Sequence, residues 1–367
     1  MSSMNFMKRL LDGAEVEWQL LEQVAKIKHG KDWKGLDAGD VPIYGSGGIM
    51  GYVDTYSYNK PSVLIPRKGS ITNIFYIETP FWNVDTIFYT EIDESKINPK
   101  FLYYFIKTID MMALDTGSGR PSLTQAILNK IKIPIPCPEN PEKSLEIQAE
   151  IVRILDAFTE LTTELTTELT ARKKQYNYYR DQLLSFEKGD VEWKTLGEIA
   201  TSIASGRNKD RTTEGSIPVY GSTGLIGFTN EAAYSGNVLL VARVGANAGR
   251  VNAVSGNFDV SDNTLIVRPI KAWNMRFAFH QLTHMNLNQY AVGGGQSLVT
   301  GGLLKSLKVP FPPLNEQERI ATILDKFDAL TNSISEGLPR EIALRQKQYE
   351  YYRDLLLSFP KPEELAA

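Results

Sequence analysis

The sequence of 367 residues has one cysteine, three histidines and no long run of apolar residues. The single Cys137 excludes an internal disulfide and is typical of a reducing compartment. No apolar run reaches membrane-spanning length, and the first 13 residues lack the apolar core of a secretory signal. We therefore expect a cytoplasmic protein that does not enter a membrane.

Motifs of catalysis and cofactor binding are also missing. The Gly-rich turn Gly245–Arg250 lacks the lysine of a phosphate-binding loop, and the glycines from Gly45 onward open no dinucleotide-binding βαβ unit. His280 and His284 have the spacing of a zinc motif, but Gln281 stands where that motif has glutamate. The prolines before Leu314 lack the preceding Asn or Asp of an amino-methyltransferase motif. We expect no catalytic residue, no cofactor and no metal in this chain.

The formal net charge of −3 does not mark the chain as a nucleic-acid binder. The acidic residues are in excess on 145–187 and 314–367, whereas 188–313 is mildly basic. The overall charge therefore hides a difference between segments.

The chain contains an internal duplication. RKKQYNYYRDQLLSF, starting at Arg172, recurs as RQKQYEYYRDLLLSF, starting at Arg345. Apolar residues at steps of three and four run through Leu145–Phe186 and Leu314–Phe359, which predicts two long α-helices. Helices of this length are typically supported by another long helix, so we expect an antiparallel coiled coil. A surface helix with a low-complexity patch is the alternative, which the matching second copy disfavours.

The second of these helices carries helix-breaking residues near its middle. Gly337 and Pro339 stand close together there, with Leu338 between them. Glycine adds backbone freedom and proline cannot donate the helical hydrogen bond. We expect this helix to break or bend at 337–339.

Each helix follows a segment rich in short β-type runs. VPIYGSGGIMGYVD from Val41 matches IPVYGSTGLIGFTN from Ile217, and SVLIPRKGS from Ser62 matches NVLLVARVGA from Asn237. Both segments then show a Gly-rich loop, a short helix and an extended Pro-rich exit, KIPIP or KVPFPP. The chain therefore divides into a mixed α/β globule (1–144), a central helix (145–187), a second globule (188–313) and a distal helix (314–367). We expect an α+β fold with pseudo-two-fold symmetry.

Together these features resemble the DNA specificity subunit of type I restriction-modification enzymes. The resemblance covers essentially the whole chain and rests on the YGSxG turns, the Gln-x-x-Ile start of each helix and the KQYxYYRDxLLSF close. TELT, repeated three times over Thr159–Thr170, is similar to the four-residue repeats of one subgroup of that family.

The resemblance implies that each globule is a target recognition domain reading one half of a bipartite double-stranded DNA site. It implies that the helices set the spacer between the halves and dock two methyltransferase subunits, to which restriction subunits attach. S-adenosylmethionine, ATP and Mg²⁺ are then expected on those partner subunits.

Contacts to bases and phosphates need cations and side chains with paired donors or acceptors. Such residues gather at strand ends and in the Gly-rich loops, where Gln296 takes the place of Arg120. The expected DNA-contacting residues are Tyr44, Ser46, Arg67, Lys68, Ser118, Arg120, Tyr220, Ser222, Arg243, Asn247, Arg250, Gln296 and Ser297. A structural role stays open for each, because the glycines can serve only as turns, the tyrosines can pack on the sheet, and Arg120 or Gln296 can contact phosphate alone.

The aromatic ends of the helices predict two equivalent partner sites, since exposed tyrosines are enriched at interfaces. The expected partner-contacting residues are Tyr178, Tyr179, Arg180, Tyr351, Tyr352 and Arg353. Packing of the tyrosines on this chain's own globules is the alternative. Leu161, Leu165 and Leu169 of the repeats are expected to set the spacer, since each repeat adds about 6 Å of helix.

Two other functions fit less well. A self-contained DNA-modifying enzyme would need an unrecognised active site, and the missing motifs disfavour it. A coiled-coil interaction protein would not need two elaborate globules.

Overall fold

The computed structural model describes residues 11, 13–117, 119–187, 189–293 and 297–360. The chain forms two compact units, of which the first comprises 1–164 and 343–367 and the second comprises 165–342. Each unit therefore holds one globule, the start of the helix that follows it and the end of the other long helical segment. The compact units thus cut across the helices, whereas the four segments expected from the sequence follow the chain.

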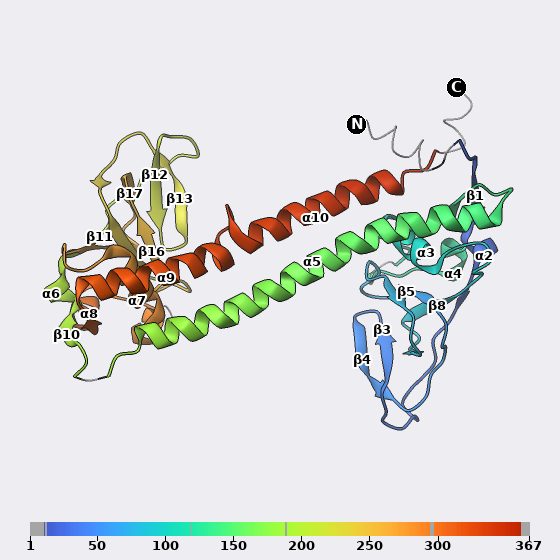
Figure 1. Ribbon diagram of the computed structural model, residues 1–367, viewed down its shortest axis with the longest axis horizontal. Helices are drawn as coiled ribbons and strands as arrows, with labels where there is room; N and C mark the ends of the chain where they lie inside the picture. Colours follow the sequence, from blue (N-terminus) through green and yellow to red (C-terminus); the bar gives the residue numbers. More distant parts are fainter. Residues whose placement is uncertain (1–10, 12, 118, 188, 294–296, 361–367) are drawn as a thin grey trace. The chain divides into compact units, whose positions relative to one another are not determined.

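The first unit is built mainly from short strands (Figure 1). Its elements are β1 (Val16–Leu20), α2 (Leu21–Val24), β2 (Ala25–Lys28), β3 (Val41–Gly45), β4 (Gly48–Val53), β5 (Ser62–Pro66), β6 (Phe75–Ile77), β7 (Trp82–Asn83), β8 (Ile87–Ile92), α3 (Pro99–Ile106), α4 (Gln125–Leu128), β9 (Lys132–Pro136) and the first part of α5 (Pro141–Leu184). One sheet has the order β2-β8-β5-β6, a second has β4-β3-β7, and β1 pairs with β9. The β3–β4 hairpin is antiparallel, whereas β3 and β7 run parallel.

The second unit repeats this plan. Its elements are β10 (Glu192–Thr195), α6 (Leu196–Ile199), β11 (Ala200–Ser205), β12 (Ile217–Gly221), β13 (Gly224–Thr229), β14 (Tyr234–Ser235), β15 (Val238–Ala242), β16 (Val251–Val254), β17 (Asn257–Val260), β18 (Thr264–Pro269), α7 (Met275–His284), η1 (Leu287–Tyr290), α8 (Gly301–Ser306), β19 (Lys308–Phe311), α9 (Leu314–Asn332) and the start of α10 (Gly337–Leu356). The sheets are β11-β18-β15-β16 and β13-β12-β17-β14, and β10 pairs with β19. The α+β fold and the internal duplication expected from the sequence are confirmed.

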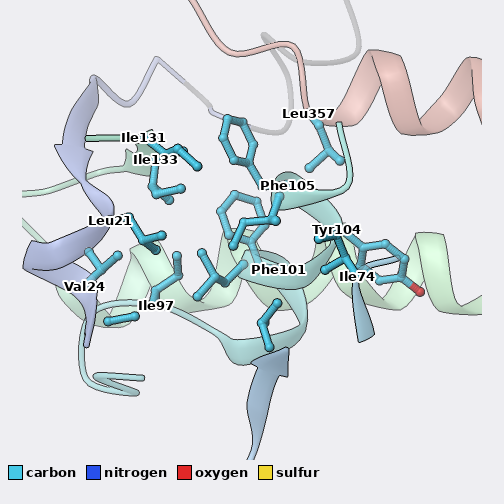
Figure 2. Packing of buried hydrophobic residues seen from close by; sticks show 14 of the residues in the cluster. Leu21, Val24, Ile74, Ile97, Phe101, Tyr104, Phe105, Ile131, Ile133 and Leu357 are labelled. Carbon is cyan, nitrogen blue, oxygen red and sulfur yellow. The ribbon is translucent and has the colours of Figure 1, made fainter. Parts of the chain in front are cut away.

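The core of the first unit gathers residues from distant parts of the chain. Figure 2 shows Phe101 and Phe105 of α3 between Leu21 and Ile133 on one side and Leu357, which follows α10, on the other. Burying one such side chain contributes about 1.5–3 kcal/mol. The end of the distal helical segment is therefore part of the first unit's core.

The Pro-rich exits are strands, as expected. β9 and β19 each pair with a single partner, β1 and β10, in a two-stranded antiparallel sheet. Every strand of such a sheet is an edge, so a proline without an N–H donor does not break a continuous ladder.

The distal helix is interrupted, which confirms the expected break. α9 ends at Asn332 and α10 begins at Gly337, whose φ is +75°. The gap lies just ahead of the Gly-Leu-Pro segment, and Pro339 falls in the first turn of α10, where its missing N–H has no helical acceptor to leave unpaired. Within the described residues, no helix combines the length and apolar character needed to cross a bilayer.

Candidate nucleic-acid interface

In the first unit, the loop after β5 is joined to the Gly-rich loop by backbone hydrogen bonds. Leu123 N donates to Arg67 O at 2.8 Å, and Gly69 N donates to Pro121 O at 2.9 Å. Lys68 lies opposite Ser122 in an isolated antiparallel bridge. Two loops that are far apart in sequence therefore form one structure that carries two cations.

Arg120 adds a third cation beside these two loops. Gly69 has φ +86°, and an ideal Cβ on it would lie 3.3 Å from Arg120 Nη2 and 3.4 Å from Ser46 Oγ. The guanidinium therefore lies over Gly69, close to the turn of the β3–β4 hairpin, where Asn73 Nδ2 donates to Ser46 O at 3.2 Å. Lys68 and Arg120 are exposed. The structure thus brings Ser46, Lys68 and Arg120 together.

Asp115, which sequence reasoning missed, organises the Gly-rich loop. Its Oδ1 accepts from Ser122 N at 2.7 Å and from Gly117 N at 2.8 Å, and these bonds hold the pKa of the carboxyl below its usual value. A Cβ on Gly117 would lie 2.0 Å from Arg120 O, so only glycine fits there. The signal in the sequence is an Asp two residues before a Gly, which is the spacing of an Asx-turn.

The second unit carries the same backbone arrangement. Val299 N donates to Arg243 O at 2.8 Å, Gly245 N donates to Ser297 O at 3.0 Å, and Gly245 has φ +80°. Arg243 therefore stands where Arg67 stands in the first unit, and Val244 replaces the cation Lys68. Ser118 and Gln296 lie outside the described residues.

Asn247 and Arg250 belong to the turn between β15 and β16. Arg250 O accepts from Ala242 N at 2.8 Å, and Asn247 O accepts from Arg250 N at 2.9 Å. Arg250 is exposed and Asn247 is half-buried. The segment is the Gly turn between strands that the sequence predicts.

Tyr44 and Tyr220 pack inside their units. The Tyr44 ring lies 5.8 Å from Phe75 and 6.4 Å from Phe81, and burial raises the pKa of its hydroxyl. Tyr220 contacts Phe258 at 6.3 Å. These contacts favour the structural role that the sequence left open, whereas Ser222 lies half-buried in the β12–β13 turn.

Each unit also exposes groups on its β-hairpin, or beside it, that sequence reasoning missed. On the first hairpin Ile49, Met50 and Tyr52 are exposed, and on the second Leu225 is exposed. After β11, the exposed Lys209 and Arg211 line a hollow with Phe228. The run GRNKDR from Gly206 could have indicated these cations.

The repeated tyrosines divide into two kinds. Tyr179 stacks on Phe327 in the second unit at 5.6 Å, and Tyr352 stacks on Phe158 in the first unit at 5.2 Å. Tyr178 is 62% exposed and Tyr351 is 55% exposed. Of the predicted partner residues, the middle tyrosine of each copy therefore faces outward most fully.

The arginines of these ends have local partners. Arg180 Nη2 lies 2.8 Å from Asp181 Oδ1, and the guanidinium lies over Tyr176 at 5.8 Å from the ring centroid. Arg353 Nη2 lies 2.6 Å from Asp354 Oδ1. Because each arginine is paired beside the outward tyrosine, the exposed surface of each copy combines an aromatic ring with an ion pair.

A buried glutamine fastens each globule to the start of its helix. Gln148 Oε1 accepts from Asn98 N at 2.7 Å, and Gln317 Oε1 accepts from Asn274 N at 2.8 Å. Both glutamines are fully buried. The Gln-x-x-Ile motif therefore ties the helix to the residue that caps α3 or α7.

An aspartate about two helical turns after each glutamine makes a second link between the helix and its globule. Asp156 accepts from Lys100 Nζ at 2.8 Å and from Tyr104 Oη at 2.6 Å. Asp325 accepts from Arg276 Nη2 at 2.6 Å and lies 2.6 Å from His280 Nε2. These links, which sequence reasoning missed, fix the orientation of each globule on its own helix.

The histidine pair has structural partners. His280 is buried against Asp325, and burial lowers its pKa although Asp325 acts in the opposite direction. His284 Nδ1 lies 3.4 Å from Asp181 Oδ1. Within the part of the chain that the structure describes, no three His, Cys, Asp or Glu side chains are grouped as a metal site requires.

The TELT units are self-contained within α5. Thr159, Thr163 and Thr170 donate their hydroxyls to the carbonyl four residues earlier at 2.8–3.0 Å. The leucines Leu161, Leu165 and Leu169 are half-buried, one per unit. Each unit therefore brings one half-buried leucine, and threonine hydroxyls bond to the helix's own backbone.

Comparison with known proteins decides the family. The type I restriction modification DNA specificity domain matches residues 15–173 and again 188–344. The chain belongs to this family. It has a DNA sequence-specificity role, and no finding supports the self-contained enzyme.

Named relatives match this chain over all or nearly all of their length. The chain is 40% identical to the EcoR124I/EcoR124II specificity subunit of Escherichia coli over 413 residues, with 100% of both chains covered. It is 39% identical to the EcoprrI specificity subunit of Escherichia coli, covering 92% of this chain and 93% of the relative. The crystal structure of the type I S subunit from M. genitalium shares the fold with TM-score 0.70 at 16% identity, covering 95% of this chain and 97% of that one.

Proposed function

We propose that the chain reads a bipartite double-stranded DNA site, with each globule reading one half. The observation that carries this is the loop pair Arg67–Gly69 with Pro121–Leu123 and its equivalent Arg243–Gly245 with Ser297–Val299. Both pairs have the same backbone bonds and keep the arginine and the glycine, but Lys68, Pro121 and Ser122 of the first pair are replaced by Val244, Ser297 and Leu298 in the second. A constant frame with variable side chains is what two readers of different sequences require.

Chemistry assigns the roles within each loop pair. In the first unit, the exposed Lys68 and Arg120 supply cations for phosphates, and arginine can also pair with both acceptors of guanine in the major groove. The second unit has Val244 in place of Lys68, so its phosphate contacts come from Arg243 and Arg250.

A segment exchange tests this proposal. Residues 188–313 are replaced by the equivalent segment of a relative, and the methylated sequence is mapped in cells that carry the partner subunits. We expect one half of the methylated sequence to change while the other is retained. Changes in both halves would contradict independent reading.

We also propose that α5 and α9–α10 pair antiparallel and set the spacer between the two half-sites. The stacked pairs Phe158–Tyr352 and Phe327–Tyr179 support this, since each joins the start of one helical segment to the end of the other.

The TELT units make the spacer adjustable. One unit adds about 6 Å of helix and roughly 400° of rotation, so the second globule advances by one to two base-pair steps of 3.4 Å with a net turn of only about 40°. Duplex DNA turns by roughly 35° per base pair, at about 10–10.5 base pairs per turn. Removing one TELT unit should shorten the unspecified spacer by about one base pair and leave both half-sites intact, as methylome sequencing will show.

The chain acts through partners in this proposal. Two methyltransferase subunits dock on the ends that carry Tyr178 and Tyr351, restriction subunits attach through them, and the complex works in the cytoplasm. S-adenosylmethionine, ATP and Mg²⁺ are used by those subunits. The purified chain, incubated alone with DNA and these three compounds, should neither methylate nor cleave it.

A further inference from the structure

The two long helical segments differ in length between equivalent aromatic residues. Phe158 and Phe327 occupy the same place in LDAF and LDKF, and Tyr179 and Tyr352 occupy the same place in QYNYYRD and QYEYYRD. Twenty-one positions separate Phe158 from Tyr179, whereas twenty-five separate Phe327 from Tyr352. The distal segment is therefore longer by four residues, which is the length of one TELT unit.

Those four residues are not helical. α5 runs without interruption from Pro141 to Leu184, but the distal segment leaves the helix between Asn332 and Gly337. Ser333–Glu336 is a loop of four residues. The number of helical positions between the equivalent aromatic residues is thus the same in both segments.

The loop makes mainly local contacts. Ile334 is 90% exposed, and Ser333 Oγ accepts from Ser335 N at 3.3 Å and from Glu336 N at 3.2 Å. An apolar side chain this exposed contributes little burial, so changing the length of this loop removes little packing. The loop is therefore a place where residues can be added or taken up without loss of core.

Gly337 fixes the place where the helix restarts. At φ +75°, a Cβ on it would lie 2.4 Å from Ala329 O and 2.7 Å from Leu330 O. Another residue there would collide with the last carbonyls of α9. Pro339 lacks the N–H that a continuous helix would use. Two residues, Gly337 and Pro339, thus specify the interruption of the helix.

Each compact unit holds one stacked pair, Phe158–Tyr352 in the first and Tyr179–Phe327 in the second. Helices joined at two such places need equal helical length between them. Four residues are about 6 Å, slightly more than one turn. A mismatch of that size would pull one stacked pair apart unless some part of the distal segment absorbed it.

We propose that Ser333–Glu336 is a slack segment that matches the distal helix to the central one and so leaves the spacer length to the central helix. This rests on the proposed function, in which paired helices set the spacer. When α5 gains one TELT unit, the compact loop extends, because four extended residues span up to about 13 Å. The spacer is then set by the number of TELT units, and this loop takes up the difference in length between the two helical segments.

The test compares two backgrounds, each co-expressed with its modification subunits. The first is the natural chain. The second, the welded chain, lacks residues 333–336 and carries Gly337→Ala and Pro339→Ala, so its distal helix is continuous with twenty-one positions, like α5. One TELT unit is inserted into α5 in both backgrounds, and methylation is mapped genome-wide.

We expect the welded chain without insertion to methylate the natural site, because its two helices match. With the insertion, the natural chain should still methylate, with a longer spacer. The welded chain with the insertion should lose at least tenfold in methylation. Two results would overturn the proposal. One is equal tolerance of the insertion in both backgrounds, and the other is loss of methylation by the welded chain that carries no insertion.

A second variant does not depend on rebuilding the helix. Four Gly/Ser residues are inserted after Ser335 in the natural chain. If the loop is a slack segment, this variant should keep its methylation and its spacer length. A changed spacer or a loss of methylation would contradict the proposal. Failure of the proposed function is distinguishable, because the TELT insertion in the natural chain would then leave the spacer unaltered.

Discussion

The Phe158 ring stacks on Tyr352 with 5.2 Å between centroids and 21° between planes. Its counterpart, Phe327 on Tyr179, has 5.6 Å and 24°. In the first unit, the stack joins Phe158 of α5 to Tyr352, which lies 194 positions further along the chain. The internal duplication therefore produces two equivalent contacts. In each, the tyrosine motif at the end of one helical segment packs on a phenylalanine in the first part of the other segment.

This stack should contribute measurable coupling. Phe158→Ala and Tyr352→Ala should each destabilise the first unit, and their double-mutant cycle should give a coupling free energy of about 0.5–1.5 kcal/mol. Urea unfolding measures it. Tyr52→Ala, which removes a ring that is 55% exposed elsewhere in the first unit, is the control and should change stability by less than about 0.5 kcal/mol. Additive effects of the first two substitutions would show that the rings are not coupled.

The second unit should lose stability on mild acidification. Burial lowers the pKa of His280 from its ordinary value of 6.5, so the unfolded chain takes up this proton at higher pH than the folded chain does. Stability is therefore highest above about pH 6.5 and falls as the pH drops toward the lowered folded value. Arg276, Asp325 and Asp328 face this ring, and Arg276 disfavours its protonation while the carboxylates favour it.

The first unit offers the matched replacement for this histidine. Tyr104, at the equivalent place, donates to Asp156 without titrating in this range. His280→Tyr should therefore flatten the pH dependence of unfolding between about pH 7 and pH 5. Burial also lowers the pKa of His284, so part of the dependence should persist. An unchanged pH profile in His280→Tyr would assign the effect to other groups.

The Gly-rich loop of the first unit should act on one half-site only. Arg120→Ala should weaken DNA binding by about 1–3 kcal/mol and relax specificity in that half if the guanidinium contacts a base edge. Arg67→Ala and Arg243→Ala should each affect their own half in the same way. Competition binding with DNA altered in one half at a time measures this.

Asp115→Ala should mimic the loss of Arg120 because it releases Gly117 N and Ser122 N from the carboxylate. Asp37→Ala removes the same charge from an exposed position elsewhere in the first unit and serves as the control. Equal effects of the two aspartate substitutions would mean that charge, and not loop geometry, is responsible.

The outward tyrosines should govern assembly. Tyr178→Ala and Tyr351→Ala should each lower the number of methyltransferase subunits bound, from two to one, because each removes an exposed ring from one docking end. Native mass spectrometry of the co-expressed complex gives the copy number. Tyr179→Ala should act mainly on stability, through its stack on Phe327. Full occupancy in both outward variants would exclude this surface.

Much of the molecule follows from the sequence by itself. Apolar residues at helical spacing give the helices, and short β-branched runs between glycines give strands such as β5 and β15. Gly337 and Pro339 give the interruption of the distal helix. The repeated sequence gives the duplication, and its motifs give the resemblance to specificity subunits. The helices, strands and interruption are local features, because periodicity and backbone conformation depend on neighbouring residues.

Other features were decided only by the tertiary structure. Which tyrosine of QYxYYRD faces outward depends on where Phe158 and Phe327 lie, whereas the sequence predicted the last two tyrosines of each copy alike as partner contacts. Asp115, Asp156 and Asp325 gained their roles from partners, and Tyr44 was committed to packing by Phe75 and Phe81. A contact between residues that are far apart in the chain depends on how whole elements pack, and local pattern carries no record of that geometry.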